Sequence, residues 1–217
     1  MLAPLAERLR PTTLDQYVGQ THLVGPDGII RRMIETGNIA SFILWGPPGV
    51  GKTTLARIIS KTINAPFYTI SAVTAGVKEV REVIERCRRD AGSMFVQGAR
   101  PILFIDEIHR FSKSQQDSLL GAVESGIVTL IGATTENPSF EVIRPLLSRA
   151  QVYTLRPLEE AELKTLLDRM NPLFPSDYKF RDIYMIATAE EDEPTTFDKA
   201  YNGLLGWVDC FEKAKLC

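Results

Sequence analysis

The segment from residue 41 to residue 64 constrains the fold of this chain most strongly. Ser41–Trp45 is a short apolar run of the kind that forms a buried parallel strand, and it stops at Gly46. Lys52–Asn64 has the apolar spacing of a helix. The loop between them matches the pattern GxxxxGK[ST] and reads Gly46, Pro47, Pro48, Gly49, Val50, Gly51, Lys52 and Thr53. A strand, this loop and a helix in direct succession predict a site that binds nucleotide phosphates.

The chemistry of this loop follows from its backbone. Glycines let the chain curl so that successive N–H groups and the start of the following helix face phosphate oxygens. We expect Lys52 to reach the β- and γ-phosphates and the Thr53 hydroxyl to coordinate Mg²⁺. Thr54 is counted with the nucleotide-binding residues. The alternative, a chance glycine-rich turn, is disfavoured by the strand before the loop and the helix after it.

A second element places two carboxylates at the end of a strand. Ile102–Ile105 is apolar throughout, and Asp106 and Glu107 follow it directly. Ligands bind at the carboxyl ends of strands in open parallel sheets. We therefore expect Asp106 to hold Mg²⁺ through water and Glu107 to orient and polarise the attacking water. A solvated acidic pair at a strand end is the competing explanation.

Hydroxyl and guanidinium groups follow the next predicted strand, Ile127–Ala133. A polar side chain there can sense the γ-phosphate, and Thr135 is favoured over Thr134 for this role. A helix or turn cap would also explain these threonines. Arg149 comes later, and an arginine supplied by a neighbouring subunit can stabilise transition-state charge. A lone arginine is more often a surface residue, so Arg149 is a candidate only because the other motifs accompany it.

The remaining pattern predicts an α/β fold with a five-stranded parallel sheet flanked by helices. Residues 1–25 read as irregular, and a helix capped by Asp27 is expected through Gly37. Strands at 67–71 and 152–155 and helices at 77–89 and 115–124 alternate, as in parallel sheets covered on both faces.

The predicted organisation has three parts, at residues 1–158, 159–170 and 171–217. The first is a nucleotide-binding core, and the second begins a helix after Pro157. The third would hold a strand at 182–189, an acidic loop and a helix at 195–216. A tail of this size cannot bury a stable core alone.

Composition excludes several classes of protein. The 217 residues carry a net charge of −2, so no global basic field advertises nucleic-acid binding. Cys87, Cys210 and Cys217 show no metal-binding spacing, and an odd cysteine count without a signal peptide indicates reduced thiols in a cytosolic protein. The longest apolar runs fall short of the roughly 18 residues of a membrane span.

Taken together, these elements resemble the AAA+ superfamily, and within it the RarA/MgsA branch of replication-associated recombination proteins, which is related to clamp loaders and to the RuvB motor. The resemblance covers about residues 3–169. Beside the phosphate loop, it rests on residues 8–23 (RLRPTTLDQYVGQTHL), 106–111 (DEIHRF), 132–141 (GATTENPSFE) and 147–149 (LSR).

The resemblance implies roles that spacing alone does not show. It places the segment 10–20 along the adenine, with Arg10, Pro11, Val18 and Gly19 as contacts. It makes Thr135 the sensor of the γ-phosphate and Arg149 an arginine finger that reaches a neighbouring subunit's ATP. His109 and Arg110 match the family's extension of the acidic motif, and their role stays open between orienting the site and forming an interface.

The resemblance also implies a cellular setting. Members are cytoplasmic, oligomeric, DNA-dependent ATPases that act at stalled replication forks and in recombination. The implied cofactors are ATP and Mg²⁺. The implied partners are forked or junction DNA, further copies of the chain, and single-strand-binding or other replication proteins, with no membrane.

The sequence departs from the family after Arg169, where a helical lid domain with a further sensor arginine would follow. Instead, residues 178–217 resemble a fragment of a flavodoxin-like NAD(P)H-dependent flavin reductase, without its phosphate loop. The resembling text is YKFRDIYMIATA at 178–189 and GWVDCF at 206–211.

Three functions are therefore weighed. The first is an ATPase that remodels DNA. The second is a nucleotide-binding module with little hydrolysis, because a site without a lid is less shielded from water. The third, suggested by the tail alone, is a flavin-dependent oxidoreductase. DNA contact is the least specific expectation, because the arginines of helix 77–89 alternate with glutamates, as on a solvated helix face.

Overall fold

The computed structural model describes residues 10–72, 75–91 and 99–170. The chain divides into two compact units, Thr12–Pro157 and a second unit formed by Met1–Pro11 with Leu158–Cys217. The predicted tail strand and helix, and the segment that resembles a flavin reductase, lie outside the described residues. Within the part of the chain that is described, no helix has the length and apolarity that crossing a membrane requires.

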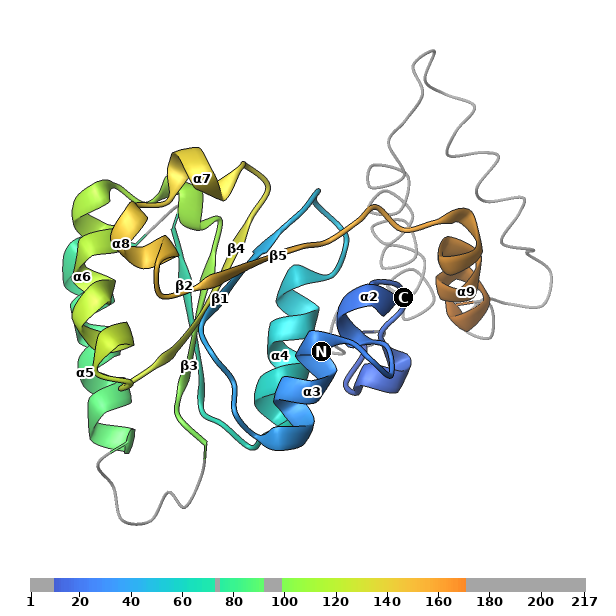
Figure 1. Ribbon diagram of the computed structural model, residues 1–217, viewed down its shortest axis with the longest axis horizontal. Coiled ribbons are helices and arrows are strands. Elements are labelled where there is room, and N and C mark those ends of the chain that lie inside the picture. The colour runs from blue at the N-terminus through green and yellow to red at the C-terminus, as the bar shows by residue number, and fades with distance from the viewer. Residues whose placement is uncertain (1–9, 73–74, 92–98, 171–217) are drawn as a thin grey trace, which may run out of the picture. The chain divides into compact units, whose positions relative to one another are not determined.

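A five-stranded parallel sheet forms the centre of the first unit (Figure 1). The strand order is β2-β3-β4-β1-β5. The strands are β1 (Phe42–Trp45), β2 (Phe67–Ser71), β3 (Ile102–Asp106), β4 (Thr129–Thr134) and β5 (Gln151–Thr154). The predicted α/β class and five-stranded parallel sheet are confirmed.

The central strands β1, β3 and β4 are buried on both faces of the sheet, and their successive side chains point to opposite sides. The edge strands β2 and β5 are more exposed. In β3, Ile102 and Phe104 pack into one hydrophobic cluster, whereas Leu103 and Ile105 pack into another. All four side chains are fully buried. Burial on both faces explains why β1 and β3 read as continuous apolar runs rather than as alternating ones.

Helices cover each face of the sheet. Figure 1 shows α3 (Ile29–Thr36) and α4 (Lys52–Thr62) on one side, and α5 (Val77–Ala91) and α6 (Lys113–Glu124) on the other. Cys87 of α5 is fully buried, and this burial raises the pKa of its thiol to about 11, so the thiol stays protonated at neutral pH. The second unit contributes one described helix, α9 (Glu160–Met170).

Several local expectations were wrong. The N-terminal region holds two short elements, η1 (Leu14–Gln16) and α2 (Thr21–Val24), where irregular chain was expected. Asp27 does not cap α3, because Gly28 occupies the cap position and the Asp27 carboxylate lies 3.7 Å from Arg32. After β4, the chain forms two further short helices, α7 (Pro138–Glu141) and α8 (Arg144–Leu147). Each has proline in its first turn, a position that favours helix starts.

Candidate nucleotide-binding site

The candidate site lies at the carboxyl edge of the sheet, where three of the sequence motifs meet. In the strand register, Asp106 at the end of β3 pairs with Ser71, and Thr134 at the end of β4 pairs with Trp45 of β1. The loop begins directly after β1, and the Gly46 N–H donates to the Thr134 carbonyl at 3.2 Å. The parallel topology thus brings the loop and the end of β4 together.

The loop needs glycine at two positions for different reasons. Gly51 has φ +91°, in the left-handed region, and a Cβ there would meet the Tyr17 hydroxyl at 2.8 Å. Gly46 has no room for a side chain, because a Cβ would lie 2.6 Å from the Leu155 carbonyl oxygen. These two requirements explain why the loop of this chain needs glycine at both positions.

Lys52 opens α4 and is buried, with only 8% of its surface exposed. Its ammonium group donates to the carbonyls of Gly46 at 2.7 Å and Pro47 at 2.8 Å, so the side chain folds back along the loop. Thr53 and Thr54 follow in the first turn of α4 and are half-buried. The helix therefore starts with its backbone N–H groups at the end of the loop, as an anion site requires.

Asp106 and Glu107 both lie at this edge and are half-buried. The pKa of Asp106 is raised above its ordinary value, first by burial and then by the neighbouring Glu107 charge. Lys52 and a backbone N–H act in the opposite direction, which places the Lys52 charge within electrostatic reach of Asp106. A carboxylate with a raised pKa is stabilised in its charged form by a bound cation.

Glu107 leaves the strand in an unusual conformation. Its φ is 54° and its ψ is 48°, a left-handed geometry that non-glycine residues adopt rarely. The residue caps the short helix η2 (Ile108–Arg110), which carries His109. The carboxylate of Glu107 lies beside the imidazole of His109, two residues further along the chain.

His109 contacts both ends of the site. Its Nδ1 lies 3.0 Å from the Thr134 hydroxyl and 3.1 Å from the Glu107 carboxylate. Only the contact with Thr134 is aligned as a hydrogen bond, since the buried Oε2 of Glu107 has no aligned partner. Sequence reasoning had left His109 between an orienting role and an interface role, and both of these contacts lie within its own chain.

The two candidate threonines occupy different environments. Thr134 is the last residue of β4 and is fully buried, whereas Thr135 is half-buried and follows the strand. The Thr134 hydroxyl accepts from the Glu136 N–H at 3.0 Å and contacts the Glu136 carbonyl at 3.2 Å. Thr134 thus holds the local turn and His109. The role of Thr135 as the γ-phosphate sensor stays a prediction.

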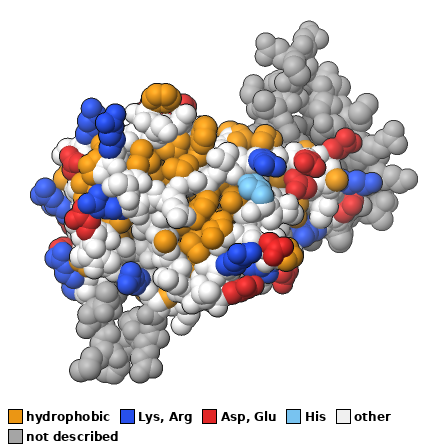
Figure 2. All heavy atoms as spheres, in the orientation of Figure 1, with side chains coloured by type: hydrophobic (Ala, Val, Ile, Leu, Met, Phe, Trp, Pro, Cys, Tyr) orange, Lys and Arg blue, Asp and Glu red, His pale blue; other side chains and the backbone are white. Residues whose placement is uncertain are grey.

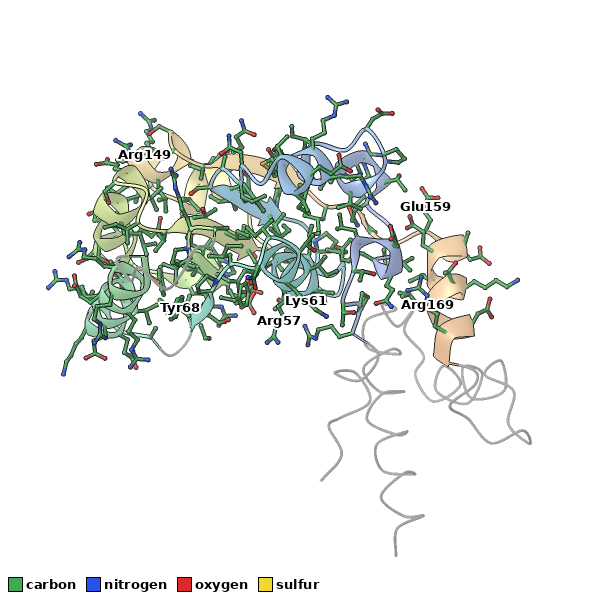
Figure 3. The ribbon with its side chains drawn as sticks, turned by 90° about the horizontal axis from the view of Figure 1, so that it is seen from below. Arg57, Lys61, Tyr68, Arg149, Glu159 and Arg169 are labelled. Atoms are coloured by element: carbon green, nitrogen blue, oxygen red, sulfur yellow. The ribbon has the colours of Figure 1, made fainter. Side chains whose placement is uncertain are left out.

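Arg149 lies outside this cluster, directly after α8. Its guanidinium contacts the Glu124 carboxylate at 2.5 Å and donates to the Pro145 carbonyl at 2.6 Å. Figure 3 shows Arg149 well separated from Arg57 and Lys61 of α4. The side chain is 37% exposed, so it remains accessible from outside the chain.

The segment before α2 buttresses the loop in a way that sequence reasoning missed. The Tyr17 hydroxyl donates to the Val50 carbonyl at 3.0 Å, and burial raises the pKa of Tyr17 far above its ordinary value. Gln20 is buried and pairs through both ends of its amide with the backbone of Arg156, at 2.7 and 2.9 Å.

The four residues predicted to contact adenine fall in different units. Val18 and Gly19 are half-buried beside Tyr17 in the first unit, and Gly19 has φ +82°. Arg10 and Pro11 are half-buried and belong to the second unit. Their roles stay predictions.

The charges of α5 are mixed rather than uniformly basic. The helix borders a surface hollow of about 630 Å³ whose charged lining is Lys78, Arg81, Glu82, Glu85, Arg86 and Arg89. Lys78 lies 3.9 Å from Glu82, and Arg88 lies 2.7 Å from Glu85. Figure 2 shows basic and acidic side chains side by side at this end of the molecule. The lining has four basic and two acidic side chains, so its charge is partly neutralised and does not by itself identify a DNA-binding surface.

Comparisons with known proteins agree with this geometry. Residues 42–158 match the family model described as the ATPase family associated with various cellular activities (AAA). The chain is 54% identical over 164 residues to replication-associated recombination protein A of Escherichia coli K12, and 53% identical over 166 residues to that of Haemophilus influenzae. Each alignment covers 76% of this chain. A more distant relative is ATPase WRNIP1 of Dictyostelium discoideum, 48% identical over 173 residues, 80% of this chain and 19% of that protein.

Solved structures give the same fold. The Thermotoga maritima RuvB Holliday junction branch migration motor matches with a TM-score of 0.62 and 30% identity, covering 76% of this chain and 54% of that one. The chain spans 36% of the length of the two bacterial recombination proteins. The segment matched by the family model, residues 42–158, contains the sheet, the phosphate loop and the strand-end carboxylates.

Proposed function

This chain belongs to the ATPase family associated with various cellular activities (AAA), and we propose that it binds Mg-ATP in the loop 46–53 and hydrolyses it to act on DNA in the cytoplasm. The single observation that carries this proposal is the meeting of the loop, Lys52, Asp106 and Glu107 at one edge of the sheet. The proposed setting is a replication fork or a recombination intermediate.

The residues at this edge divide the chemistry between them. Lys52 and the backbone N–H groups at the start of α4 would bind phosphate oxygens. Thr53 and Asp106 offer oxygen ligands, which suit a hard cation, and the raised pKa of Asp106 favours a bound positive charge. Mg²⁺, when bound, would neutralise charge on the phosphates. Glu107 would orient and polarise the attacking water.

We further propose that the active form is an oligomer in which Arg149 completes a neighbouring copy's site. Two observations support this role: Arg149 is partly exposed, and its hydrogen bonds are to Glu124, Pro145 and Ser148 rather than to the loop of its own chain. A guanidinium held at a surface can meet a phosphate presented by another subunit.

The DNA part of the proposal rests on the relatives. The E. coli and H. influenzae proteins are named for replication-associated recombination, and the T. maritima structure for Holliday junction branch migration. The 54% identity to the E. coli protein extends over 164 residues of this chain, which supports carrying the setting over. We place single-strand-binding or other replication proteins among the partners on the same basis.

Binding of Mg-ATP tests the site directly. Calorimetric titration of the full chain should show one site, and Lys52→Ala should weaken the affinity by about tenfold to a hundredfold, the worth of a hydrogen bond to a charged group. Lys61→Ala is the matched control, because Lys61 is an exposed lysine near the other end of α4 (Figure 3). Thermal melting would check that both variants fold. Equal affinities of Lys52→Ala and the unaltered chain would contradict the proposed site.

A further inference from the structure

We propose that His109 is a positioning residue, which orients the Glu107 carboxylate through its Nδ1–H and is itself held by Thr134. This inference rests on the proposed role of Glu107 in polarising water. It adds a further group to the proposed hydrolytic machinery and assigns that group a defined tautomer.

The geometry places His109 between two groups of the site. Its Nδ1 lies 3.1 Å from Oε2 of Glu107 and 3.0 Å from Oγ1 of Thr134. The His109 side chain is only 15% exposed and that of Glu107 is 31% exposed, while Thr134 is fully buried. Little water can therefore replace either contact, and each is worth more than the same contact at the surface.

The acceptors around Nδ1 fix where the histidine proton lies. An ionised carboxylate can only accept hydrogen bonds, so Glu107 requires a donor at Nδ1. The single hydrogen of the Thr134 hydroxyl has an acceptor in the Glu136 carbonyl at 3.2 Å, which leaves Oγ1 to accept from Nδ1 and from the Glu136 N–H. Both neighbours therefore favour the tautomer with the proton on Nδ1.

The single Nδ1–H of His109 faces two acceptors and can donate to either of them. In this structure Nδ1 is aligned with Thr134, and Oε2 of Glu107 is buried without an aligned hydrogen bond. A buried carboxylate oxygen without a donor is unfavourable, and the Nδ1–H of His109 is a donor beside it. A small rotation of the imidazole would align the same N–H with Glu107.

The backbone at Glu107 and Thr134 gives the contact between His109 and Glu107 its importance. Glu107 sits in the left-handed region with φ 54°, so its Cα–Cβ direction is set by the turn and its carboxylate is aimed by χ angles alone. Thr134 is also tied to the loop, because its carbonyl accepts from the Gly46 N–H at 3.2 Å. His109 consequently links the phosphate loop, the end of β4 and Glu107.

Paired substitutions at His109 separate donation from packing. Asparagine places an amide N–H near the position of Nδ1, whereas glutamine places it near Nε2. We expect His109→Gln and His109→Ala to lower kcat for ATP by about tenfold to a hundredfold, with KM and Mg-ATP affinity unchanged. His109→Asn should stay within a few-fold of the unaltered chain. Equal losses in His109→Asn and His109→Gln, or no loss in His109→Ala, would overturn the proposal.

A measurement without turnover keeps this inference separate from the proposed ATPase activity. The chain has two histidines, and His22 Nε2 lies 2.9 Å from the Thr154 carbonyl, which can only accept. Long-range ¹H–¹⁵N correlation spectra at a pH of about 8, where an ordinary histidine is neutral, should therefore show opposite tautomers. His22→Gln assigns the two signals.

The two readouts have distinct meanings. The Nδ1–H tautomer at His109, with an ¹⁵Nδ1 shift that moves in Glu107→Gln, supports the proposal even if the chain turns over no ATP. The Nε2–H tautomer at His109 overturns it even if the chain is an active ATPase. Absence of turnover in the unaltered chain would count against the proposed function alone.

Discussion

Replacing Glu107 by glutamine should lower ATP turnover by about 10²–10⁴-fold, the usual contribution of a positioned general base. Glutamine has nearly the shape of glutamate but cannot take a proton or carry negative charge, so the attacking water would lose its activation. Glu107 makes no aligned hydrogen bond through its buried Oε2, so the change should cost little stability. Phosphate release at saturating Mg-ATP measures the effect.

Two controls make the Glu107→Gln result specific. Mg-ATP affinity should remain at the level of the unaltered chain, because Glu107 is not placed among the phosphate ligands. Glu82→Gln removes an exposed glutamate of α5 and should leave turnover unchanged. Comparable turnover by Glu107→Gln and the unaltered chain would show that another group activates the water.

Replacing Arg149 by alanine should lower turnover by about 10³-fold or more, as expected for an arginine finger. The Mg-ATP affinity of the same chain should persist. The ion pair with Glu124 is partly exposed at 37% and 47%, and pairs of this kind contribute about 0–1 kcal/mol, so folding should survive its loss. Arg149→Lys should recover little activity, because an ammonium cannot bind phosphate bidentately.

Mixing two inactive variants tests whether Arg149 acts between subunits. Glu107→Gln keeps its arginine, and Arg149→Ala keeps its glutamate. In a mixed oligomer, an arginine from the first would face an intact site of the second, and part of the turnover should return. Phosphate release that stays at the level of the separate variants at every mixing ratio would contradict action in trans.

The sequence predicted the fold well where an apolar run is ended by a polar residue. β3 was predicted at Ile102–Ile105, and the observed strand starts at the same residue and ends one residue later, at Asp106. β4 was displaced: Ile127 and Val128 precede the strand, while Thr134 lies inside it. Hydrophobicity could not show this, because the strand begins and ends with buried threonines, Thr129 and Thr134.

The site was predicted in part, and its missing members are those fixed by tertiary contacts. The positions of Lys52, Asp106 and Glu107 at one sheet edge follow from a motif and from parallel topology. The roles of Tyr17 and Gln20 depend on partners 33 and 136 residues away, Val50 and Arg156. No local pattern encodes such contacts. The left-handed turn at Glu107 could not be predicted either, because no glycine stands at that position.

Turnover of Mg-ATP by the full chain, with and without forked DNA, tests the central claim most directly. Forked DNA should raise the steady-state rate of phosphate release at low salt. The stimulation should fall as the salt concentration rises, because the release of counterions from DNA into solution becomes less favourable at high ionic strength. A rate that forked DNA leaves unchanged at low salt, in a chain that binds Mg-ATP, would contradict a DNA-acting ATPase.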